Sequence, residues 1–518
     1  MKRNFQSPPF HFFFSFMALA LCFVLPSSVS SGDASSKGRN KFQSESRHWL
    51  QFRGPNASGI APENADPPIL FSADTNLLWK TEILPGWSSP CIVDDKIFLT
   101  GFNKEDSMLH TFAVNRENGE ILWKDSVRLR STYALHPINS YANPTVASDG
   151  KKVFAHLPGY GLIAYKPDGT KCWEFRHQPL GFFMAGASSP VVKDSVVLVN
   201  INCRGKTRIV ALDCETGDSL WAINDSLHIK SLVGRASSPV VWGNLLIMHQ
   251  NMNVVAYNTL TRKAEWWMST PTTGVSTPVV YGDVMYLGAW TNFGEKSVNG
   301  INFTFNDLLR DYDKDQNQKL EQTEMPDTLM IYSRPESAEE PMTDMPLNDN
   351  MVYQEIDKNK DLALDSLEWA AFMQMLKPYL EPHGMLALPV TGSGELSASD
   401  ILWKVTDNTP ETPSPLVVGD NVFFIKNGGI ITVINRETGE VVKKERVGAT
   451  GAYFSSPMFA GNKIYTCSYN GTVSVLSGDD FSVLALNKLK EKIGASPVAV
   501  DDVLYIRTDK HLYAFRNQ

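Results

Sequence analysis

Apolar residues occur along most of the chain in short runs of strand length. Eight of these runs are preceded by similar short sequence motifs. The eight motifs are "WSSP" (87–90), "YANP" (141–144), "GASSP" (186–190), "RASSP" (235–239), "VSTP" (275–278), "TPSP" (412–415), "FSSP" (454–457) and "GASP" (494–497). Their prolines are 54, 46, 49, 39, 137, 42 and 40 residues apart. A period in the forties, built from strands and turns, is typical of a β-propeller with one four-stranded sheet per repeat. Eight repeats predict an all-β, eight-bladed propeller.

The repeats share a turn that usually ends in Trp. "ALDCETGDSLW" (211–221) matches "AVNRENGEILW" (113–123), "AYKPDGTKCW" (164–173), "AYNTLTRKAEW" (256–266) and "VINRETGEVVK" (433–443). The glycines of this turn can adopt the positive φ that a tight hairpin requires; they are Gly119, Gly169, Gly217 and Gly439. We expect the indoles to pack between blades and not to bind ligands; they are Trp123, Trp173, Trp221, Trp266 and Trp403. Lys443 and Leu484 stand near the Trp position in blades six and seven.

The two ends of the repeat region predict how the ring closes. "HLYAFRNQ" (511–518) supplies a third strand without a fourth, and "NLLWKTEI" (76–83) is a fourth-type strand without a blade before it. We expect the strand around Trp79 to complete blade eight, because this pairing removes exposed sheet edges.

The N-terminus predicts export. Lys2 and Arg3 precede an apolar run (10–25) and the small residues "PSSVSSG", the pattern of a signal peptide at 1–31. An uncleaved anchor at 10–25 is the alternative. No later run reaches the roughly 18 to 20 apolar residues of a membrane helix. We expect an exported monomer, periplasmic or extracellular, with no stable membrane span after cleavage.

Charge is concentrated in one segment. The chain of 518 residues has a net charge of −8, but residues 301–381 alone contain 18 Asp/Glu and 7 Lys/Arg. The remainder contains 41 Lys/Arg and 38 Asp/Glu. This distribution predicts a cation site in the acidic segment and no nucleic-acid partner.

Two stretches of the acidic segment match a calcium-binding loop. Such a loop has oxygen ligands at positions 1, 3, 5, 9 and 12 and a backbone carbonyl at position 7. In "DKDQNQKLEQTE" (313–324) these are Asp313, Asp315, Asn317, Glu321 and Glu324, with the carbonyl of Lys319. In "DKNKDLALDSLE" (357–368) they are Asp357, Asn359, Asp361, Asp365 and Glu368, with the carbonyl of Ala363. Every ligand position is filled in both copies.

The flanks of both loops carry apolar residues at helical spacing, which predicts an EF-hand pair at 296–382 between two strands of blade five. We expect the loops to pair through their position 8, Leu320 with Leu364. Position 6 is normally Gly because φ is positive there, but this chain has Gln318 and Leu362. The sites are therefore weakened, the second more than the first. The alternative is that the loops are polar remnants without metal. The remaining blades then occupy 49–295 and 383–518.

"ALDCETGDSLW" (211–221) resembles the tryptophan-docking repeat of the pyrroloquinoline-quinone (PQQ) propellers. The stretches "WLQFRGPNASGIA" (49–61) and "ETPSPLVVGDNVFFIKNGGIITVINRETGEV" (411–441) are similar to exported bacterial PQQ-like repeat proteins. The resemblance covers 49–290 and 383–518. This family includes quinoprotein alcohol dehydrogenases and the non-enzymatic lipoprotein subunit of the outer-membrane β-barrel assembly machine. It implies the propeller fold but leaves the activity open.

The family leaves two main functions for this chain. One is a binding scaffold for protein or cell-envelope partners. The other is a PQQ- and calcium-dependent dehydrogenase that oxidises alcohols or sugars. Such enzymes typically stack the quinone on a disulfide between adjacent cysteines and use a Glu, an Asn and an Asp with calcium. Beyond the signal, Cys91, Cys172, Cys203, Cys214 and Cys467 include no adjacent pair, and no catalytic or quinone-binding residue can be assigned. A lectin or glycosidase is a third class, without a recognisable carboxylate pair.

Residues that precede the innermost strands are candidates for lining the central channel. They are Trp87, Asn143, Arg235 and Tyr453, which either contact a ligand or only fill the channel. Arg53, in "FRGP", is expected to anchor the N-terminal segment. Fold alone does not imply a site.

Overall fold

The computed structural model describes residues 47–129, 135–136, 138–177, 186–203, 206–225, 237–295, 298–335 and 344–518. The predicted signal peptide and Arg235 lie outside these residues. Within them, no helix is long and apolar enough to cross a membrane.

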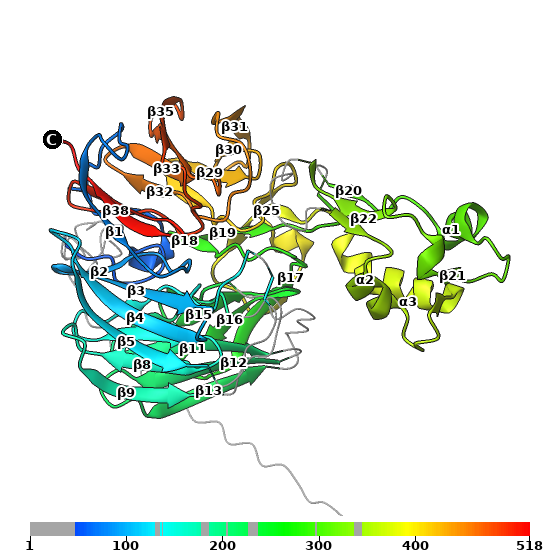
Figure 1. The fold of residues 1–518 in the computed structure, drawn as a ribbon, viewed down its shortest axis with the longest axis horizontal. Coiled ribbons are helices and arrows are strands. Elements are labelled where there is room, and N and C mark those ends of the chain that lie inside the picture. Colours follow the sequence, from blue (N-terminus) through cyan, green and yellow to red (C-terminus); the bar gives the residue numbers. More distant parts are fainter. Residues whose placement is uncertain are drawn as a thin grey trace, which may run out of the picture. The chain divides into compact units, whose positions relative to one another are not determined.

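Strands that are consecutive in sequence form small antiparallel sheets, as a propeller requires (Figure 1). Four of these sheets are β2 Cys91–Val93, β3 Lys96–Asn103, β4 Met108–Asn115 and β5 Ile121–Arg128; β6 Ala147–Ser148, β7 Val153–Leu157, β8 Gly161–Tyr165 and β9 Lys171–Arg176; β10 Val191–Lys193, β11 Val196–Cys203, β12 Lys206–Asp213 and β13 Ser219–Asp225; and β14 Val240–Trp242, β15 Leu245–His249, β16 Asn253–Asn258 and β17 Ala264–Ser269, which β26 Gly394–Leu396 extends in parallel.

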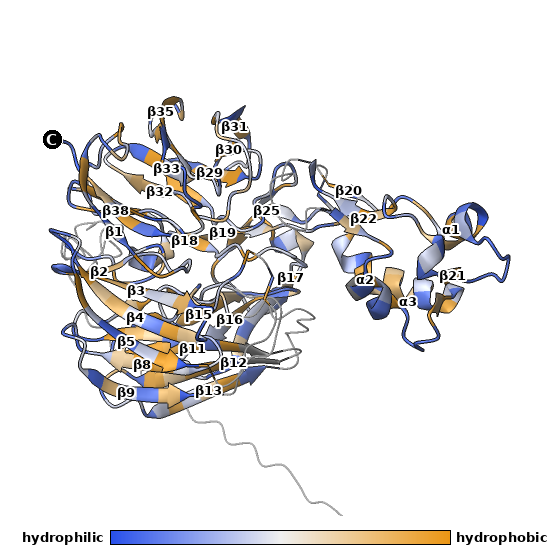
Figure 2. Cartoon of the chain, in the orientation of Figure 1, coloured by the Kyte–Doolittle hydropathy of each residue, from blue (hydrophilic) through white to orange (hydrophobic). Residues whose placement is uncertain are grey.

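Four more sheets follow along the chain. They are β18 Val279–Tyr281, β19 Val284–Ala289, β25 Gly384–Pro389 and β27 Trp403–Val405; β28 Leu416–Val418, β29 Asn421–Lys426, β30 Ile430–Asn435 and β31 Val441–Arg446; β32 Met458–Ala460, β33 Lys463–Cys467, β34 Thr472–Ser477 and β35 Val483–Lys488; and β36 Val498–Val500, β37 Val503–Arg507 and β38 His511–Phe515 with β1 Leu77–Glu82. The middle strands are buried and apolar, and Figure 2 shows polar residues gathered at many of the turns. The described 3₁₀ segments are η1 Pro55–Ala57, η2 Gln322–Glu324, η4 Lys377–Tyr379 and η5 Ala398–Asp400.

The predicted Trp docking is confirmed. Gly119, Gly169, Gly217 and Gly439 have φ of 78°, 93°, 78° and 74°. Each lies so close beneath an indole of the preceding sheet that a Cβ would come within 2.5–2.8 Å of it; the indoles are Trp79, Trp123, Trp173 and Trp403. These four indoles, and Trp266, donate their Nε1–H to backbone carbonyls at 2.9–3.1 Å. The turn glycine therefore provides both the hairpin and the surface on which the indole of the preceding sheet packs.

Two sheets have no Trp at the docking position, and the prediction for one of them was correct. Lys443 does occupy the Trp position, where its Nζ donates to the carbonyl of Asp480 at 2.9 Å. In the next sheet that position belongs to Ala485, not to Leu484, because Ala485 pairs with Val475 as Lys443 pairs with Val433.

The second repeat is also shifted from its predicted register. β6 begins at Ala147, so Val146 occupies the place of the other prolines and Pro144 lies two residues earlier. The dipeptide Asn143–Pro144 resembles the repeated motif, but it is not aligned with that motif in the structure.

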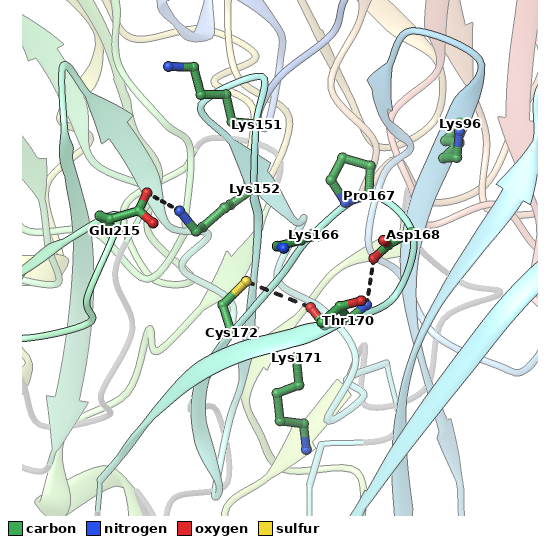
Figure 3. Close-up of a pocket in the computed structure, with 10 residues that line it drawn as sticks. All are labelled: Lys96, Lys151, Lys152, Lys166, Pro167, Asp168, Thr170, Lys171, Cys172 and Glu215. Carbon is green, nitrogen blue, oxygen red and sulfur yellow. Dashed lines mark hydrogen bonds and ion pairs between the residues drawn. The ribbon is translucent and has the colours of Figure 1, made fainter.

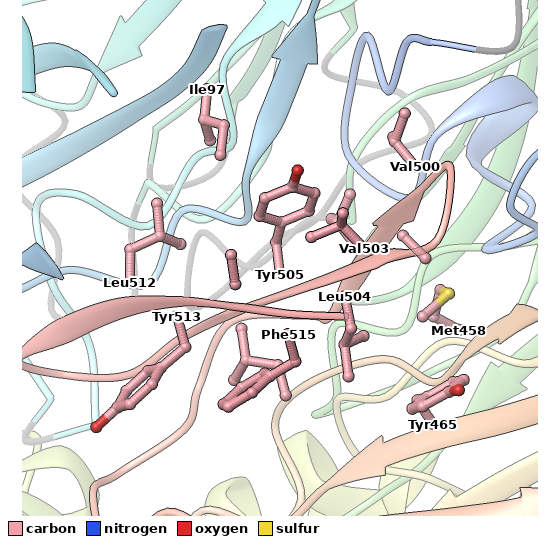
Figure 4. Close-up of a cluster of buried hydrophobic side chains, with 14 of the residues drawn as sticks. Ile97, Met458, Tyr465, Val500, Val503, Leu504, Tyr505, Leu512, Tyr513 and Phe515 are labelled. Atoms are coloured by element: carbon pink, nitrogen blue, oxygen red, sulfur yellow. The ribbon is translucent and has the colours of Figure 1, made fainter. Parts of the chain in front are cut away.

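The ring closes as predicted, by an antiparallel pairing of β1 with β38 (Figure 1). Arg116 of the first sheet reinforces this junction, because its guanidinium bonds Tyr505, the carbonyl of Val500 and Asp501 of the last sheet. Figure 4 shows the apolar side chains of the closing sheet. They pack against Ile97 on one side and Met458 on the other.

The insert is the segment that follows β19, and the chain returns to the same sheet at β25. Its elements are β20 Asn299–Gly300, α1 Phe305–Tyr312, β21 Leu320–Glu321, β22 Met330–Ser333, β23 Asp344–Pro346, α2 Asn350–Ile356, β24 Ala363–Leu364 and α3 Ser366–Leu376. It has its own apolar core, in which Trp369 stacks on Phe303 and Phe305. A separate core explains how the unit can interrupt a sheet.

Candidate functional site

The first acidic loop is pre-formed by its own backbone. Asp313 accepts the amide protons of Asn317 (3.2 Å) and Gln318 (2.9 Å). Glu324 accepts those of Lys314 (2.8 Å) and Glu321 (3.1 Å), so it lies across the loop. Ligand oxygens of Asp313, Asp315 and Glu324 lie within 4.8 Å of one another. Converging carboxylates of this kind are ligands for a hard cation such as Ca²⁺.

The second loop repeats this arrangement in a more buried setting. Asp357 accepts the amide protons of Lys360 (2.7 Å) and Leu362 (3.1 Å), and Glu368 accepts that of Lys358 (2.8 Å). Asp357 is 4% exposed and Glu368 is 8% exposed. Asp357, Asp361 and Glu368 also bring oxygens within 4.8 Å of one another.

Contacts between the loops join them into one unit. Leu320 pairs with Leu364 in the short β21–β24 ladder, as expected for position 8. The Tyr353 hydroxyl, from α2, lies 2.8 Å from the carbonyl oxygen of Leu320 and 2.9 Å from that of Leu362. The ammonium of Lys319 lies 2.6 Å from Asp361. A lysine of the first loop therefore forms an ion pair with a predicted ligand of the second.

The predicted strain at position 6 is present. Gln318 has φ of 64° and Leu362 has φ of 67°, both in the left-handed region that favours Gly. Crowding is also evident among the carboxylates: the Glu324 side chain is the largest cause that raises the pKa of Glu321. The first loop ends in η2 and then β22, whereas the second is flanked by helices on both sides.

A second candidate site lies on the propeller axis, where a ring of eight hydroxyl residues precedes the innermost strands. They are Ser89, Thr145, Ser189, Ser238, Thr277, Ser414, Ser456 and Ser496. The N–H of each donates to the hydroxyl oxygen of the next at 2.9–3.2 Å, and the last bond returns from Ser496 to Ser89. All eight side chains are buried and line one cavity of about 570 Å³. None of their O–H groups donates to a described protein atom.

The rim of this cavity comes from residues two positions before the ring. Trp87, Asn143 and Phe454 are among them, so the predicted channel positions of Trp87 and Asn143 are confirmed. The predicted channel position of Tyr453 is wrong. Its side chain is fully buried in a blade core, where its hydroxyl donates to the carbonyl of Ala449. The side chain that reaches the cavity at this point is the next one, Phe454. The insert contributes Arg334, which is 2.7 Å from Glu411.

The N-terminal segment crosses the far ends of the innermost strands. Trp49 bridges Ile92 and Ile60 bridges Phe459, while Phe52 from the same segment lines the cavity. Arg53 anchors this segment, as expected, by donating to carbonyls that include Ser58 (2.9 Å) and Pro415 (2.6 Å).

Two buried guanidinium groups adjoin the hydroxyl ring, and no carboxylate of the described residues is bonded to either. Arg53 also contacts the carbonyl of Ser414 (3.4 Å), and Arg507 bonds the carbonyl (2.9 Å) and the hydroxyl of Ser88. Desolvation lowers the pKa of both to about 9, so both remain cationic at neutral pH. Sequence reasoning missed Arg507, which no motif distinguishes.

A surface pocket of about 740 Å³ lies elsewhere on the propeller, and Figure 3 shows several lysines around it. Acidic side chains offset these charges. Lys96 pairs with Asp95 at 2.7 Å, Lys171 pairs with Asp125 at 3.1 Å, and Lys152 pairs with Glu215. Lysines whose charge is already offset by a neighbouring carboxylate do not define a ligand site.

Comparison with known proteins agrees with this architecture. A family model described as outer membrane protein assembly factor BamB matches residues 69–297 and 387–518, and leaves out the segment that holds both acidic loops. No curated protein matches the chain.

Three similar solved structures are a europium-containing methanol dehydrogenase (11% identity, TM-score 0.50, 91% of this chain and 98% of that one), the quinohemoprotein alcohol dehydrogenase ADHIIG from Pseudomonas putida HK5 (12%, 0.50, 91% and 80%) and the computationally designed Ika8 protein (9%, 0.50, 84% and 97%). At these identities the likeness concerns the fold alone, a β-propeller of PQQ-like repeats.

Proposed function

We propose that this chain, which belongs to the family of outer membrane protein assembly factor BamB, is an exported calcium-binding β-propeller that acts as a binding scaffold. In this proposal the eight sheets are eight blades, residues 1–31 are a signal peptide and 296–382 are an EF-hand pair. Its partners belong to the cell envelope, in the periplasm or outside the cell.

The observation that carries the calcium assignment is the convergence of ligands in two paired loops. Each loop brings three carboxylates together and orients them with backbone N–H groups. Those amides do not neutralise the charge, whereas a divalent cation does. The Leu320–Leu364 pairing supports two cooperating sites over two separate polar turns.

The alternative function is a PQQ- and calcium-dependent dehydrogenase, since two structural neighbours are named as methanol and alcohol dehydrogenases. The described residues do not fit this group. The free cysteines Cys91, Cys172, Cys214 and Cys467 include no adjacent pair to form a disulfide platform. The acidic residues that line the described cavity are Glu355 and Glu411, and Glu411 is already bonded to Arg334 and Asn427. We therefore derive no catalytic step through the quinone.

Calorimetric titration with Ca²⁺ after chelator treatment tests the proposal. We expect binding in the parent and none in the double variant Asp313→Asn, Asp357→Asn, which keeps the shape of both side chains. Parent protein that binds no calcium contradicts the assignment. Incubation with PQQ and calcium tests the alternative: a retained quinone absorption band with dye-linked alcohol oxidation favours the dehydrogenase.

A further inference from the structure

The two helices that flank the second acidic loop also form part of the wall of the axial cavity, the cavity that the hydroxyl ring lines. α2 ends immediately before Asp357, and its Val352 and Glu355 line the cavity. α3 contains Glu368, the last ligand position of the loop. The residues of α3 that line the cavity are Phe372, Met375 and Leu376. Each helix therefore joins a predicted calcium ligand to the cavity wall.

Direct contacts join α3 to the propeller at the cavity end. The short η4 continues α3, and its Tyr379 is 5% exposed and lines the cavity. The Tyr379 hydroxyl donates to the side-chain oxygen of Asn251, another lining residue, at 3.2 Å. The Tyr379 carbonyl accepts the hydroxyl of Thr291 at 2.9 Å. Asn251 and Thr291 belong to the propeller, so a displacement of α3 also changes the propeller side of the cavity.

α3 has the properties of a rigid connection. No Gly or Pro interrupts it between Glu368 and Leu376. Sharp bends in helices almost always occur at such residues or at bulges, so we expect α3 to move as one body. Eight residues of α-helix span about 12 Å. A rotation at the loop end is therefore carried over that distance to the cavity end.

Calcium competes with contacts that hold Glu368 in place. The Glu368 carboxylate accepts the backbone N–H groups of Lys358 (2.8 Å) and Asn359 (3.1 Å), on the entering side of the loop. A glutamate at position 12 binds calcium with both oxygens, so the ion draws on the same carboxylate. In EF-hand sensors, calcium binding changes the angle between the flanking helices by roughly 40°. Binding at the second loop is therefore expected to shift α3 relative to α2.

The first loop has no comparable route to the cavity. None of the described residues of α1, the helix that precedes Asp313, lines the cavity. The loop ends in η2, and β22, which does reach the cavity with Ile331 and Tyr332, begins only at Met330. The two loops therefore differ in what their occupation by an ion can move.

We propose that calcium bound in the second loop controls the shape of the axial cavity, by moving α3 and, through Tyr379, the propeller residues that contact it. Calcium in the first loop does not have this effect. The inference rests on the proposed calcium-binding function and names a regulatory role for one of its two sites. The insert thereby gives the propeller cavity a calcium-dependent wall.

Hydrogen exchange followed by mass spectrometry tests the coupling on the full chain, with chelator-treated protein compared with calcium-saturated protein. We expect exchange to change at least about threefold in the propeller segments 249–254 and 289–293, which contain the partners of Tyr379. Segment 441–446, on the outer strand β31, is the internal reference and stays unchanged. Asp357→Asn is expected to abolish the change, whereas Asp313→Asn is expected to keep it.

Calcium calorimetry on the same preparations separates the two possible failures. Parent protein that binds no calcium contradicts the proposed function. Parent protein that binds calcium without a change in exchange at 249–254 and 289–293 overturns the coupling alone. A change that survives Asp357→Asn and is lost in Asp313→Asn assigns the control to the first loop and also overturns the proposal.

Tyr379→Phe tests the route between α3 and the propeller. The substitution removes the hydroxyl that bonds Asn251 and keeps the ring, so calcium affinity should stay within about twofold while the response of 249–254 is lost. Tyr312→Phe, on α1, is the matched control and keeps the response. If Tyr379→Phe does not fold, as judged by thermal melting, Thr291→Val removes the other contact and should abolish the response of 289–293. The parent's response in a folded variant of either contact contradicts the proposal.

Discussion

Charged side chains have different surroundings in the propeller and in the insert. In the propeller, Arg53 and Arg507 are buried, and both donate hydrogen bonds to backbone carbonyl oxygens. In the insert, the carboxylates of two loops accept backbone amides but remain clustered together. The first arrangement keeps the geometry of the fold without a ligand, whereas the second is the one to which we assign a cation in the proposed function. The closure of the propeller and the proposed metal sites therefore belong to separate parts of one chain.

The largest effect is expected from breaking the propeller at its closure. Deletion of 32–84 removes β1, the Trp79 indole that docks on the first sheet, and the Arg53 anchor. We expect no stable fold, because the last sheet keeps an exposed edge and several buried carbonyls lose their donors. Soluble expression and circular dichroism measure this. A soluble, monomeric truncation with the melting temperature of the parent contradicts the closure argument.

Removing the insert tests the other half of the comparison. Replacement of 296–382 by a short Gly/Asn turn joins β19 to β25, which already pair directly. We expect the propeller to remain folded and calcium binding to be lost completely, because the insert has its own core and holds both acidic clusters. Melting curves and calcium calorimetry report the two outcomes. Retention of the parent's calcium affinity instead places the ion in the propeller axis.

The two loops are expected to differ in strength. Glu324→Gln should weaken calcium binding more than Glu368→Gln, by roughly tenfold. The second loop is handicapped by the branched Leu362 at positive φ and by the Lys319 ammonium on Asp361. Calorimetry of both single variants decides the ranking. A larger loss for Glu368→Gln shows that the greater burial of the second loop outweighs both handicaps.

The propeller should lose stability in acid through its buried histidines. Desolvation lowers the pKa of His249 to about 4, and desolvation with the nearby His177 lowers that of His156 to about 3. Both imidazoles are neutral in the native state, whereas their pKa values in the unfolded state have the ordinary value of about 6.5. The unfolded state therefore binds protons first, so the free energy of unfolding is highest above about pH 6.5 and falls as the pH drops toward 4. Each contributes on the order of 1 kcal/mol per pH unit in that window.

Urea unfolding across this pH range measures the effect. In His249→Gln, the new amide can still donate to the carbonyl of Ser276, and the pH dependence should be shallower. The same slope in the variant and the parent excludes His249 as the source.

The smallest effect concerns the contact between the loops. Lys319→Met removes the ammonium that lies 2.6 Å from Asp361 but keeps the position-7 carbonyl. We expect the second site to bind calcium a few-fold more tightly, since the ion no longer competes with an internal cation. Competition with a chromophoric chelator resolves such a change. Lys358→Met, which removes a pair with the non-ligand Glu355, is the control.

Local patterns could predict much of this molecule. The docking tryptophans, the turn glycines and the pairing of Leu320 with Leu364 each follow from a motif whose chemistry is nearby in sequence. Pro144 misled the predicted register because the second repeat lacks the aligned proline. Leu484 lies one residue before the true Trp position, which is Ala485 paired with Val475. The hydroxyl ring could not be predicted from the sequence, although most of its residues lie within the repeated motifs. Each of its bonds joins residues about 40 or more positions apart, and only ring closure shows that they form a cycle.

The direction of the bonds in that cycle has an electrostatic consequence. Every N–H points to the hydroxyl of the next sheet in the same sense, so the eight bond dipoles run head to tail around the axis. Tangential dipoles arranged in a circle cancel, unlike the aligned peptides of a helix, which add up along one direction. The cycle therefore joins neighbouring sheets without creating a net dipole along the axis.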